Sequence, residues 1–248
     1  MIVALLLGRK GSVGFPGKNL YPVLGRPLAL YPMLAARLAR SVDKVYISTD
    51  CEKLTKLARE NDVEIIERPD YLCTDEAKGA DAFVHGYSVI KERTSASDIE
   101  LAVLMFCNAA TILPETIEEG IKVLRENPSY DSAVTVSRYN MYSPLRARKI
   151  GNDGLLHPFV PFEAIGDPET FNCNRDSQGD AYFADVSVSI VRPYWLENIE
   201  EGILPQKWMG KRIYPLKQWG GLDVDYEWQI PQVEYWLKKN LKEKHAKV

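Results

Sequence analysis

The chain has 248 residues, of which 46% are hydrophobic, and it carries a formal net charge of −3. This length suffices for one domain with a large buried core, and the negative charge argues against a general nucleic-acid binder, because such proteins carry a strongly basic surface. No apolar run reaches the length of a membrane span, and the first residues lack the leader pattern of a signal peptide. We therefore expect a cytoplasmic protein with no membrane or nucleic-acid partner.

The first half of the chain alternates short apolar segments with helical patterns. The apolar segments predict strands at Ile2 to Leu7, Lys44 to Ser48, Val63 to Ile66, Leu101 to Phe106 and Ala133 to Val136. The segments between them predict helices at Leu28 to Ala39, Glu52 to Glu60, Ala80 to Lys91 and Glu115 to Arg125. This order predicts a three-layer α/β fold, in which helices cover both faces of a mainly parallel sheet and ligands bind at the carboxyl ends of the strands.

A glycine-rich, basic loop follows the first predicted strand. After Leu7, glycines stand at positions 11, 14 and 17, with the cations Arg9 and Lys18 on either side of them. Glycine allows backbone conformations that are closed to other residues, so several amide N–H groups can face one anion, and the two cations suit a polyphosphate. The spacing fits neither a P-loop nor the dinucleotide fingerprint. The loop predicts a phosphate site, with an ordinary surface turn as the alternative.

The regular alternation stops between Arg138 and Asp180, in a segment with four prolines and weak periodicity. A loop this long inside a compact domain is usually functional or forms an arm that reaches a partner subunit. We therefore expect a single domain over residues 1–248, with residues 138–180 as an inserted dimerisation or substrate-binding subdomain. Regular structure resumes with strands at Val186 to Val191 and near Arg212 to Leu216, and with a last helix at Gln232 to Lys242.

A pair of carboxylates, Asp223 and Asp225, lies near the end of the chain. Residues i and i+2 of an extended segment face the same side, and Mg²⁺ commonly takes one or two carboxylates together with phosphate oxygens and water. The alternative is an acidic turn that caps the last helix, since Asp is a favoured N-cap residue. Together with a phosphate site, the pair indicates Mg²⁺-dependent nucleotidyl transfer.

Further motifs follow one another along the chain. They are Gly25-x-Pro27-Leu28, the strand Val45-Tyr46-Ile47-Ser48-Thr49-Asp50, Arg68-Pro69 with Leu72, Asp75 and Asp81, Arg175 with Tyr182, and Leu222-Asp223-Val224-Asp225. With Arg9, Gly11, Ser12, Gly14, Lys18, Asn19 and Leu20 of the basic loop, this series resembles the CMP-sialic acid synthetases, or acylneuraminate cytidylyltransferases, and more distantly the 3-deoxy-manno-octulosonate cytidylyltransferases. The resemblance covers nearly the whole chain and implies the Rossmann-like sheet of nucleotidyltransferases with an inserted arm exchanged in a homodimer.

The resemblance also implies a reaction, in which a hydroxyl of an acidic sugar attacks the α-phosphate of CTP to give a CMP-sugar and pyrophosphate. It assigns catalysis to Arg9, Lys18 and Asp223, and Mg²⁺ binding to Asp223 and Asp225. Contacts to the nucleotide are implied for Leu7, Arg9, Gly11, Ser12, Gly14, Lys18, Asn19, Arg68, Asp81 and Asn108. Contacts to the acceptor sugar are implied for Arg175, Tyr182 and Asp185.

The chain departs from the family pattern at several of these positions. Val13 stands where the family usually has lysine, with Lys10 as a candidate replacement, and Asn108 is the nearest amide to an absent glutamine. Asp176 replaces a glutamine and Asp185 an asparagine beside the implied acceptor residues. This negative charge would repel an anionic sugar unless Asp185 joins the metal or pairs with Arg175. We therefore expect an acceptor other than N-acetylneuraminate, such as another nonulosonic acid or a phosphonate.

Three alternatives remain open at this point. A nucleotide-sugar glycosyltransferase shares the sheet and an Asp-x-Asp site, but usually has that site in the middle of the chain. A sugar-1-phosphate nucleotidyltransferase normally begins with a Gly-x-Gly-Thr-Arg-Leu loop, which this sequence lacks. The third alternative is a non-catalytic nucleotide-binding relative, because Val13 and the absent glutamine remove two groups expected at the site.

Overall fold

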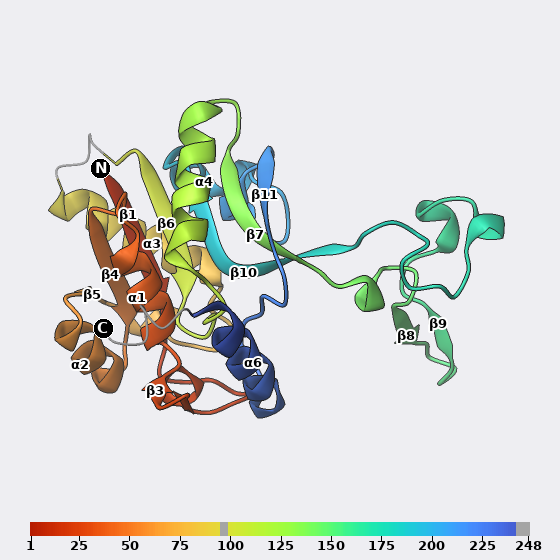
Figure 1. Ribbon diagram of the computed structural model, residues 1–248, viewed down its shortest axis with the longest axis horizontal. Coiled ribbons are helices and arrows are strands. Elements are labelled where there is room, and N and C mark those ends of the chain that lie inside the picture. Colours follow the sequence, from red (N-terminus) through yellow and green to blue (C-terminus); the bar gives the residue numbers. More distant parts are fainter. Residues whose placement is uncertain (95–98, 242–248) are drawn as a thin grey trace.

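A computed structural model describes residues 1–94 and 99–241, and a seven-stranded sheet forms its centre (Figure 1). The strand order is β11-β7-β10-β6-β1-β4-β5. The strands are β1 (Ile2–Leu7), β4 (Lys44–Thr49), β5 (Glu64–Glu67), β6 (Leu101–Phe106), β7 (Ser132–Arg138), β10 (Tyr182–Val191) and β11 (Ile213–Gln218). Strand β10 runs antiparallel to both of its neighbours and the other pairs are parallel, which confirms the mainly parallel sheet.

Helices cover both faces of this sheet and complete the three predicted layers (Figure 1). They are α1 (Leu30–Leu38), α2 (Glu52–Glu60), α3 (Gly79–Arg93), α4 (Pro114–Glu126) and α5 (Tyr194–Glu197), and a further helix, α6 (Ile230–Asn240), packs beside the sheet in a separate cluster. All residues of β1 are buried, and alternate side chains of a strand point to opposite faces. Ile2, Ala4 and Leu6 therefore pack with α1, α2 and α4, while the other three pack with α3. None of the helices described is long and apolar enough to span a bilayer.

A separate apolar cluster joins the two ends of the chain. Val233 and Trp236 of α6 pack with Phe15 and Leu28, which flank the small hairpin of β2 (Pro22–Val23) and β3 (Arg26–Pro27). Val224 is fully buried in the same cluster. Because Val224 lies between Asp223 and Asp225, this cluster holds the acidic pair beside the glycine-rich loop.

Residues 139–181, which we call the arm, leave the sheet after β7 and project from the rest of the molecule before β10 begins (Figure 1). The arm has its own hairpin of β8 (Arg148–Ile150) and β9 (Leu156–Pro158). Large apolar side chains on it remain in solvent, with Ile150 74% and Leu156 71% exposed. The arm coincides with the predicted insertion at 138–180, and its role in dimerisation stays a prediction.

Most predicted elements are confirmed to within a few residues, and β10 is the clearest exception. It begins at Tyr182 rather than at Val186, because residues 182–184 also pair with β7, ahead of a bulge that shifts the register between Ala184 and Ser189. Val186 has a φ of 50° in this bulge, which is unusual for a β-branched residue. The last helix, α6, ends at Asn240, and Lys242 of its predicted range lies outside the described residues.

Candidate active site

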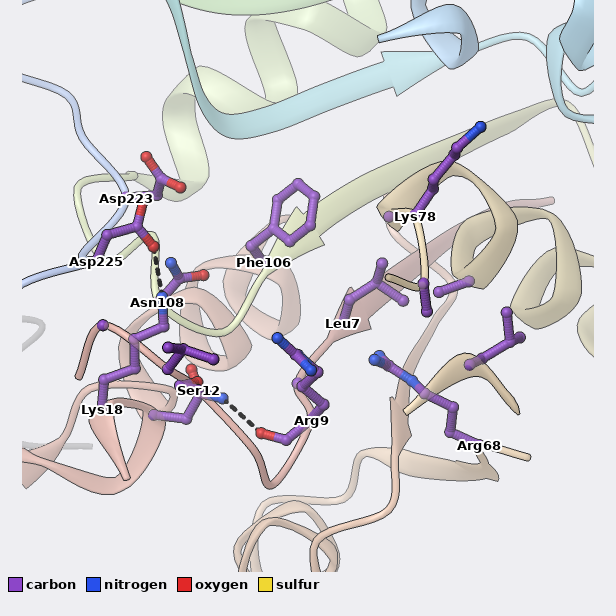
Figure 2. A pocket seen from close by; sticks show the side chains of 18 of the residues that line it. Leu7, Arg9, Ser12, Lys18, Arg68, Lys78, Phe106, Asn108, Asp223 and Asp225 are labelled. Atoms are coloured by element: carbon purple, nitrogen blue, oxygen red, sulfur yellow. Dashed lines mark hydrogen bonds and ion pairs between the residues drawn. The ribbon is translucent and has the colours of Figure 1, made fainter. Parts of the chain in front are cut away.

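A cavity of about 440 Å³ opens where β1 and β6 end, as expected for the carboxyl edge of a parallel sheet (Figure 2). Its walls come from the loop after β1, the loop before α3, the end of β6 and the segment before α6. The structure brings ten of the predicted site residues to this cavity: Leu7, Arg9, Ser12, Gly14, Lys18, Asn19, Arg68, Asn108, Asp223 and Asp225. The basic loop and the acidic pair therefore form one site.

Lys18 and Asp225 make the direct link between the two ends of the chain. The Lys18 Nζ atom lies 2.6 Å from Asp225 Oδ1, although the residues are 207 positions apart in the sequence. Gly14 also approaches this segment closely, since a Cβ atom placed on it would lie 2.8 Å from the Asp225 carbonyl oxygen. The basic loop and the acidic segment, which we define as residues 221–225, are therefore in contact through both side-chain and backbone atoms.

Only one of the three glycines of the basic loop has the backbone conformation that was predicted for them. Gly17 has a φ of 75°, in the left-handed region that favours glycine. Gly11 and Gly14 have no such φ, so the prediction that they adopt conformations closed to other residues is wrong. Gly14 is explained instead by its close approach to Asp225, whereas Gly11 has open space around it and does not line the cavity.

Hydrogen bonds to the backbone of the acidic segment hold it against the residues that follow β6. The Val224 amide donates to the Asn108 carbonyl oxygen at 2.9 Å, and Asn108 Nδ2 donates back to the Val224 carbonyl oxygen at 3.0 Å. The Leu222 amide donates to Thr111 Oγ1 at 3.0 Å. Asn108 thus lines the cavity but uses its amide nitrogen to hold the acidic segment.

The environment of Asp223 and Asp225 fits a divalent cation. Burial raises the pKa of the Asp223 carboxyl above its ordinary value, and the nearby Asp225 carboxylate raises it further. Among the described residues, no cation forms an ion pair with Asp223, and no third Asp, Glu, His or Cys joins the pair in a metal-binding cluster. Two carboxylates with open positions suit an ion whose other ligands are phosphate oxygens and water.

The alternative role for the two aspartates, capping the last helix, is not observed. The N-cap residue of the 3-10 helix Glu227–Gln229 is Tyr226, and that of α6 is Gln229. Gln229 Oε1 accepts hydrogen bonds from the amides of Asp225 and Tyr226 at 2.7 and 2.8 Å. The helix start therefore fixes the Asp225 backbone and leaves both carboxylates to the cavity.

Arg9 and Arg68 supply positive charge on the other side of the cavity (Figure 2). Arg9 forms an ion pair with Asp75 at 2.7 Å, and the buried Asn19 donates to the Arg9 carbonyl oxygen at 3.3 Å. Arg68 is only 6% exposed and donates from Nη2 to the Ser48 carbonyl oxygen at 2.7 Å. Burial lowers its pKa from the ordinary value, and no carboxylate in the described part of the chain forms an ion pair with it.

Several residues singled out from the sequence lie outside the cavity. Asp81 is exposed on the first turn of α3 and does not line it, and neither does Lys10. Val13 does line the cavity and is 76% exposed. The loop thus presents an apolar side chain where the resemblance implies lysine.

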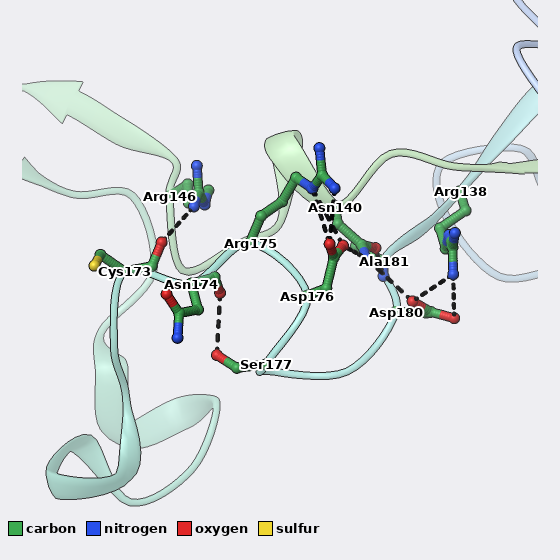
Figure 3. Close-up of polar contacts among 10 residues, drawn as sticks. All are labelled: Arg138, Asn140, Arg146, Cys173, Asn174, Arg175, Asp176, Ser177, Asp180 and Ala181. Carbon is green, nitrogen blue, oxygen red and sulfur yellow. Dashed lines mark hydrogen bonds and ion pairs between the residues drawn. The ribbon is translucent and has the colours of Figure 1, made fainter.

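The residues implied for the acceptor are not gathered at this cavity. Arg175 lies on the arm and pairs with its neighbour Asp176 at 2.8 Å (Figure 3). Tyr182 begins β10 at the base of the arm, while Asp185 is buried and pairs with neither Arg175 nor the acidic segment. Within one chain, none of these three residues lines the cavity.

Other lining residues were missed from the sequence. Phe106, Ala77, Lys78, Gly79, Ala82 and Tyr226 all line the cavity. Phe106 is the last residue of β6 and pairs in register with Leu7, the last residue of β1. Its position at the end of a strand beside the glycine-rich loop is the signal that could have identified it, because neighbouring parallel strands end at the same edge.

Residues 3–185 match the family described as cytidylyltransferase, which is most of the chain. The chain belongs to the cytidylyltransferase family. This membership confirms the resemblance drawn from the motifs and favours it over the glycosyltransferase and sugar-1-phosphate nucleotidyltransferase alternatives.

Curated relatives and a solved structure agree with this assignment. The chain is 27% identical to the N-acylneuraminate cytidylyltransferase of Escherichia coli O18:K1:H7, over 58% of this chain and 33% of the relative. It is 23% identical to the N-acylneuraminate cytidylyltransferase of Oncorhynchus mykiss, over 93% of this chain and 49% of the relative. The chain therefore spans between a third and a half of these relatives.

The solved structure is a CMP:2-keto-3-deoxy-manno-octonic acid synthetase complexed with CTP. It superposes with a TM-score of 0.66 at 16% identity, and the alignment covers 97% of this chain and 99% of the other. This similarity confirms the nucleotidyltransferase type of fold for the cytidylyltransferase.

Proposed function

We propose that this cytidylyltransferase transfers CMP from CTP to a hydroxyl group of an acidic sugar and releases pyrophosphate. The observation that carries the proposal is the single cavity in which the basic loop meets Asp223 and Asp225. Relatives named for N-acylneuraminate and for 8-amino-3,8-dideoxy-manno-octulosonate support an acidic sugar as the acceptor.

The charges of the cavity suggest how CTP lies in it. The triphosphate would bind near Arg9, Ser12 and Lys18, with Asp223 and Asp225 holding a Mg²⁺ ion that neutralises charge on the phosphates. The base would lie toward Arg68, whose buried guanidinium can donate to a carbonyl oxygen. Leu7 and Phe106 offer apolar surface between these two ends.

The chemistry then requires alignment more than covalent help from the protein. The acceptor oxygen bonds to the α-phosphorus, its proton is released, and the bond from that phosphorus to the α,β-bridging oxygen breaks. Lys18 and Arg9 would stabilise negative charge that builds up on the transferred group and on pyrophosphate.

Pyrophosphate release in the presence of CTP and Mg²⁺ tests this function directly. The acceptors should include N-acetylneuraminate, pseudaminic acid, 8-amino-3,8-dideoxy-manno-octulosonate and a phosphonate. Turnover that is lost in Asp225→Ala supports the proposal, whereas CTP binding without turnover in both proteins would favour a non-catalytic relative. A clear preference for N-acetylneuraminate would reject the expectation of a different acceptor, which Asp185 no longer supports because it is buried outside the cavity.

We also propose that the protein acts as a homodimer in the cytoplasm. The exposed apolar side chains of the arm would be covered by a second copy, and the four unpaired cysteines suit a reducing compartment. An arm that reaches the other copy would also explain why Arg175 lies outside its own cavity. Mixing Arg175→Ala with Asp223→Asn tests this, because restored activity requires sites built from two chains, and no recovery in a proven dimer would contradict it.

A further inference from the structure

Asp185 is a buried carboxylate beneath the acidic segment, and the proposed reaction leaves it without a role. It is 5% exposed and lies in the β10 bulge next to Val186, whose φ is 50°. Its two oxygens accept from three neutral donors: Ser137 Oγ at 2.7 Å and Gln218 Nε2 at 3.0 Å on Oδ2, and the Ser187 amide at 3.2 Å on Oδ1. Val186 is in an unfavourable backbone conformation, and the buried Asp185 side chain bonds to neutral donors. Such a costly arrangement indicates a functional role.

Ser137 connects this carboxylate to the acidic segment. Its Oγ atom donates to Asp185 and at the same time accepts a hydrogen bond from the Gly221 amide at 2.8 Å. The Gly221 carbonyl oxygen accepts from the Tyr139 hydroxyl at 3.0 Å. Both polar groups of the Gly221 backbone are thus fixed, two residues before Asp223.

The backbone at Gly221 packs closely against Asp185. A Cβ atom placed on Gly221 would lie 2.2 Å from Asp185 Oδ2, so the backbone passes directly over the carboxylate. From this point, the hydrogen bonds to Thr111 and Asn108 carry the segment on to Asp225. Asp185 therefore determines the position of the start of the acidic segment, while Asn108 and Thr111, which follow β6, determine the position of the rest.

We propose that Asp185 is a positioning residue, which acts through Ser137 to orient the Gly221–Asp225 segment for binding a divalent cation. This inference rests on the proposed function, because it takes Asp223 and Asp225 as the cation ligands. Loss of a partner bonded directly to a metal ligand typically weakens metal binding about 10- to 100-fold, and we expect the lower end of this range for a residue that acts through the backbone of the segment.

The carboxylate is required because every partner of Asp185 is a donor. An asparagine would place its NH₂ group either against the Ser187 amide or against Ser137 and Gln218. In the first orientation the NH₂ group opposes the Ser187 amide, and in the second it opposes Gln218 Nε2 and removes the acceptor that directs the Ser137 hydroxyl. Asp185→Asn therefore leaves at least one of these donors without an acceptor while keeping the shape of the side chain.

The test measures Mn²⁺ binding to the protein with CTP by electron paramagnetic resonance, in wild type, Asp185→Asn and Ser137→Ala. Ser132→Ala is the matched control, because this buried serine lies on the same strand, β7, and donates its hydroxyl to the Met209 carbonyl oxygen instead. We expect Asp185→Asn and Ser137→Ala to bind Mn²⁺ at least about tenfold more weakly, while Ser132→Ala binds it like wild type. CTP affinity in EDTA, measured by calorimetry, should be the same in all four proteins.

Two results would overturn this inference in different ways. Mn²⁺ affinity in Ser137→Ala and Asp185→Asn equal to that of Ser132→Ala would reject the positioning role and leave the cation site intact. A wild-type protein that binds no Mn²⁺ would reject the cation site of the proposed function itself. If Asp185→Asn does not fold, Ser137→Ala alone decides between these outcomes, since it changes a neutral side chain by one oxygen atom.

Discussion

A methyl group added at Gly14 should disturb the site through a single contact. The Cβ atom of Gly14→Ala would lie 2.8 Å from the Asp225 carbonyl oxygen, whereas ordinary van der Waals contact begins at 3.4 Å, so the two backbones must move apart by about 0.6 Å. A misplacement of about 1 Å at a catalytic site can cost about 100-fold in rate. We therefore expect kcat/KM to fall about 10- to 100-fold, which corresponds to about 1.4–2.7 kcal/mol.

The matched control is Gly11→Ala, since a Cβ atom at Gly11 meets nothing within 4 Å and neither glycine has a left-handed φ. Pyrophosphate release measures the rate, and the melting temperature shows whether the fold is affected. Because Gly14 is exposed, the strain should displace the loop instead of unfolding the protein. Equal rates for Gly14→Ala and Gly11→Ala would refute the reasoning that this contact aligns the basic loop with the acidic segment.

Three further perturbations address the charges of the site. Arg68→Met should weaken CTP binding at least about tenfold by calorimetry, because a hydrogen bond from a charged donor contributes about 1.5–3 kcal/mol; an unchanged affinity would place the nucleotide elsewhere. Asp223→Asn should raise the melting temperature of the metal-free protein near neutral pH, because a carboxyl whose pKa is raised on folding destabilises the folded protein as the pH rises through that pKa. This gain in melting temperature should shrink as the pH falls toward 3.8, the ordinary pKa of the group, and a gain that does not change with pH would contradict the proposed cause. Removal of divalent cations with EDTA should stop pyrophosphate release and weaken CTP binding, and turnover that persists in EDTA would exclude the cation site.

The sequence was sufficient for those parts of the site that are local. The residue types of the loop from Arg9 to Lys18 and of the pair Asp223 and Asp225 indicate phosphate and cation binding from short segments alone, and the alternating elements predict the edge of the sheet that the loop reaches. The meeting of the two depends on the apolar cluster of Val224 with α6 and with residues before α1, a set of long-range contacts that the periodicity of the chain does not predict. That the loop and the acidic pair meet was predicted from the resemblance to the family and not from the periodicity of the sequence.

The sequence was insufficient where tertiary contacts decide which way a residue faces. Asp185 was predicted to contact the acceptor, but the bulge at Val186 changes the register of β10 and buries its carboxylate. Phe106 reads as the end of a core strand, and only its pairing with Leu7 brings it to the cavity. Arg175 was predicted to contact the acceptor, but it lies on the arm, where it pairs with Asp176 and does not line the cavity of its own chain.

The ion pair between Lys18 and Asp225 would connect the binding of nucleotide to the proposed binding of a cation. Lys18 is held by Asp225 at 2.6 Å, so the group proposed to bind phosphate is neutralised by a group proposed to bind Mg²⁺. A cation that engages Asp225 would release Lys18 toward the triphosphate, and a triphosphate that engages Lys18 would release Asp225 toward the cation. Because coupling between two ligands is reciprocal, each should raise the affinity for the other. If Asp225 binds the cation as proposed, the pair would therefore favour joint binding of Mg²⁺ and CTP over binding of either one alone.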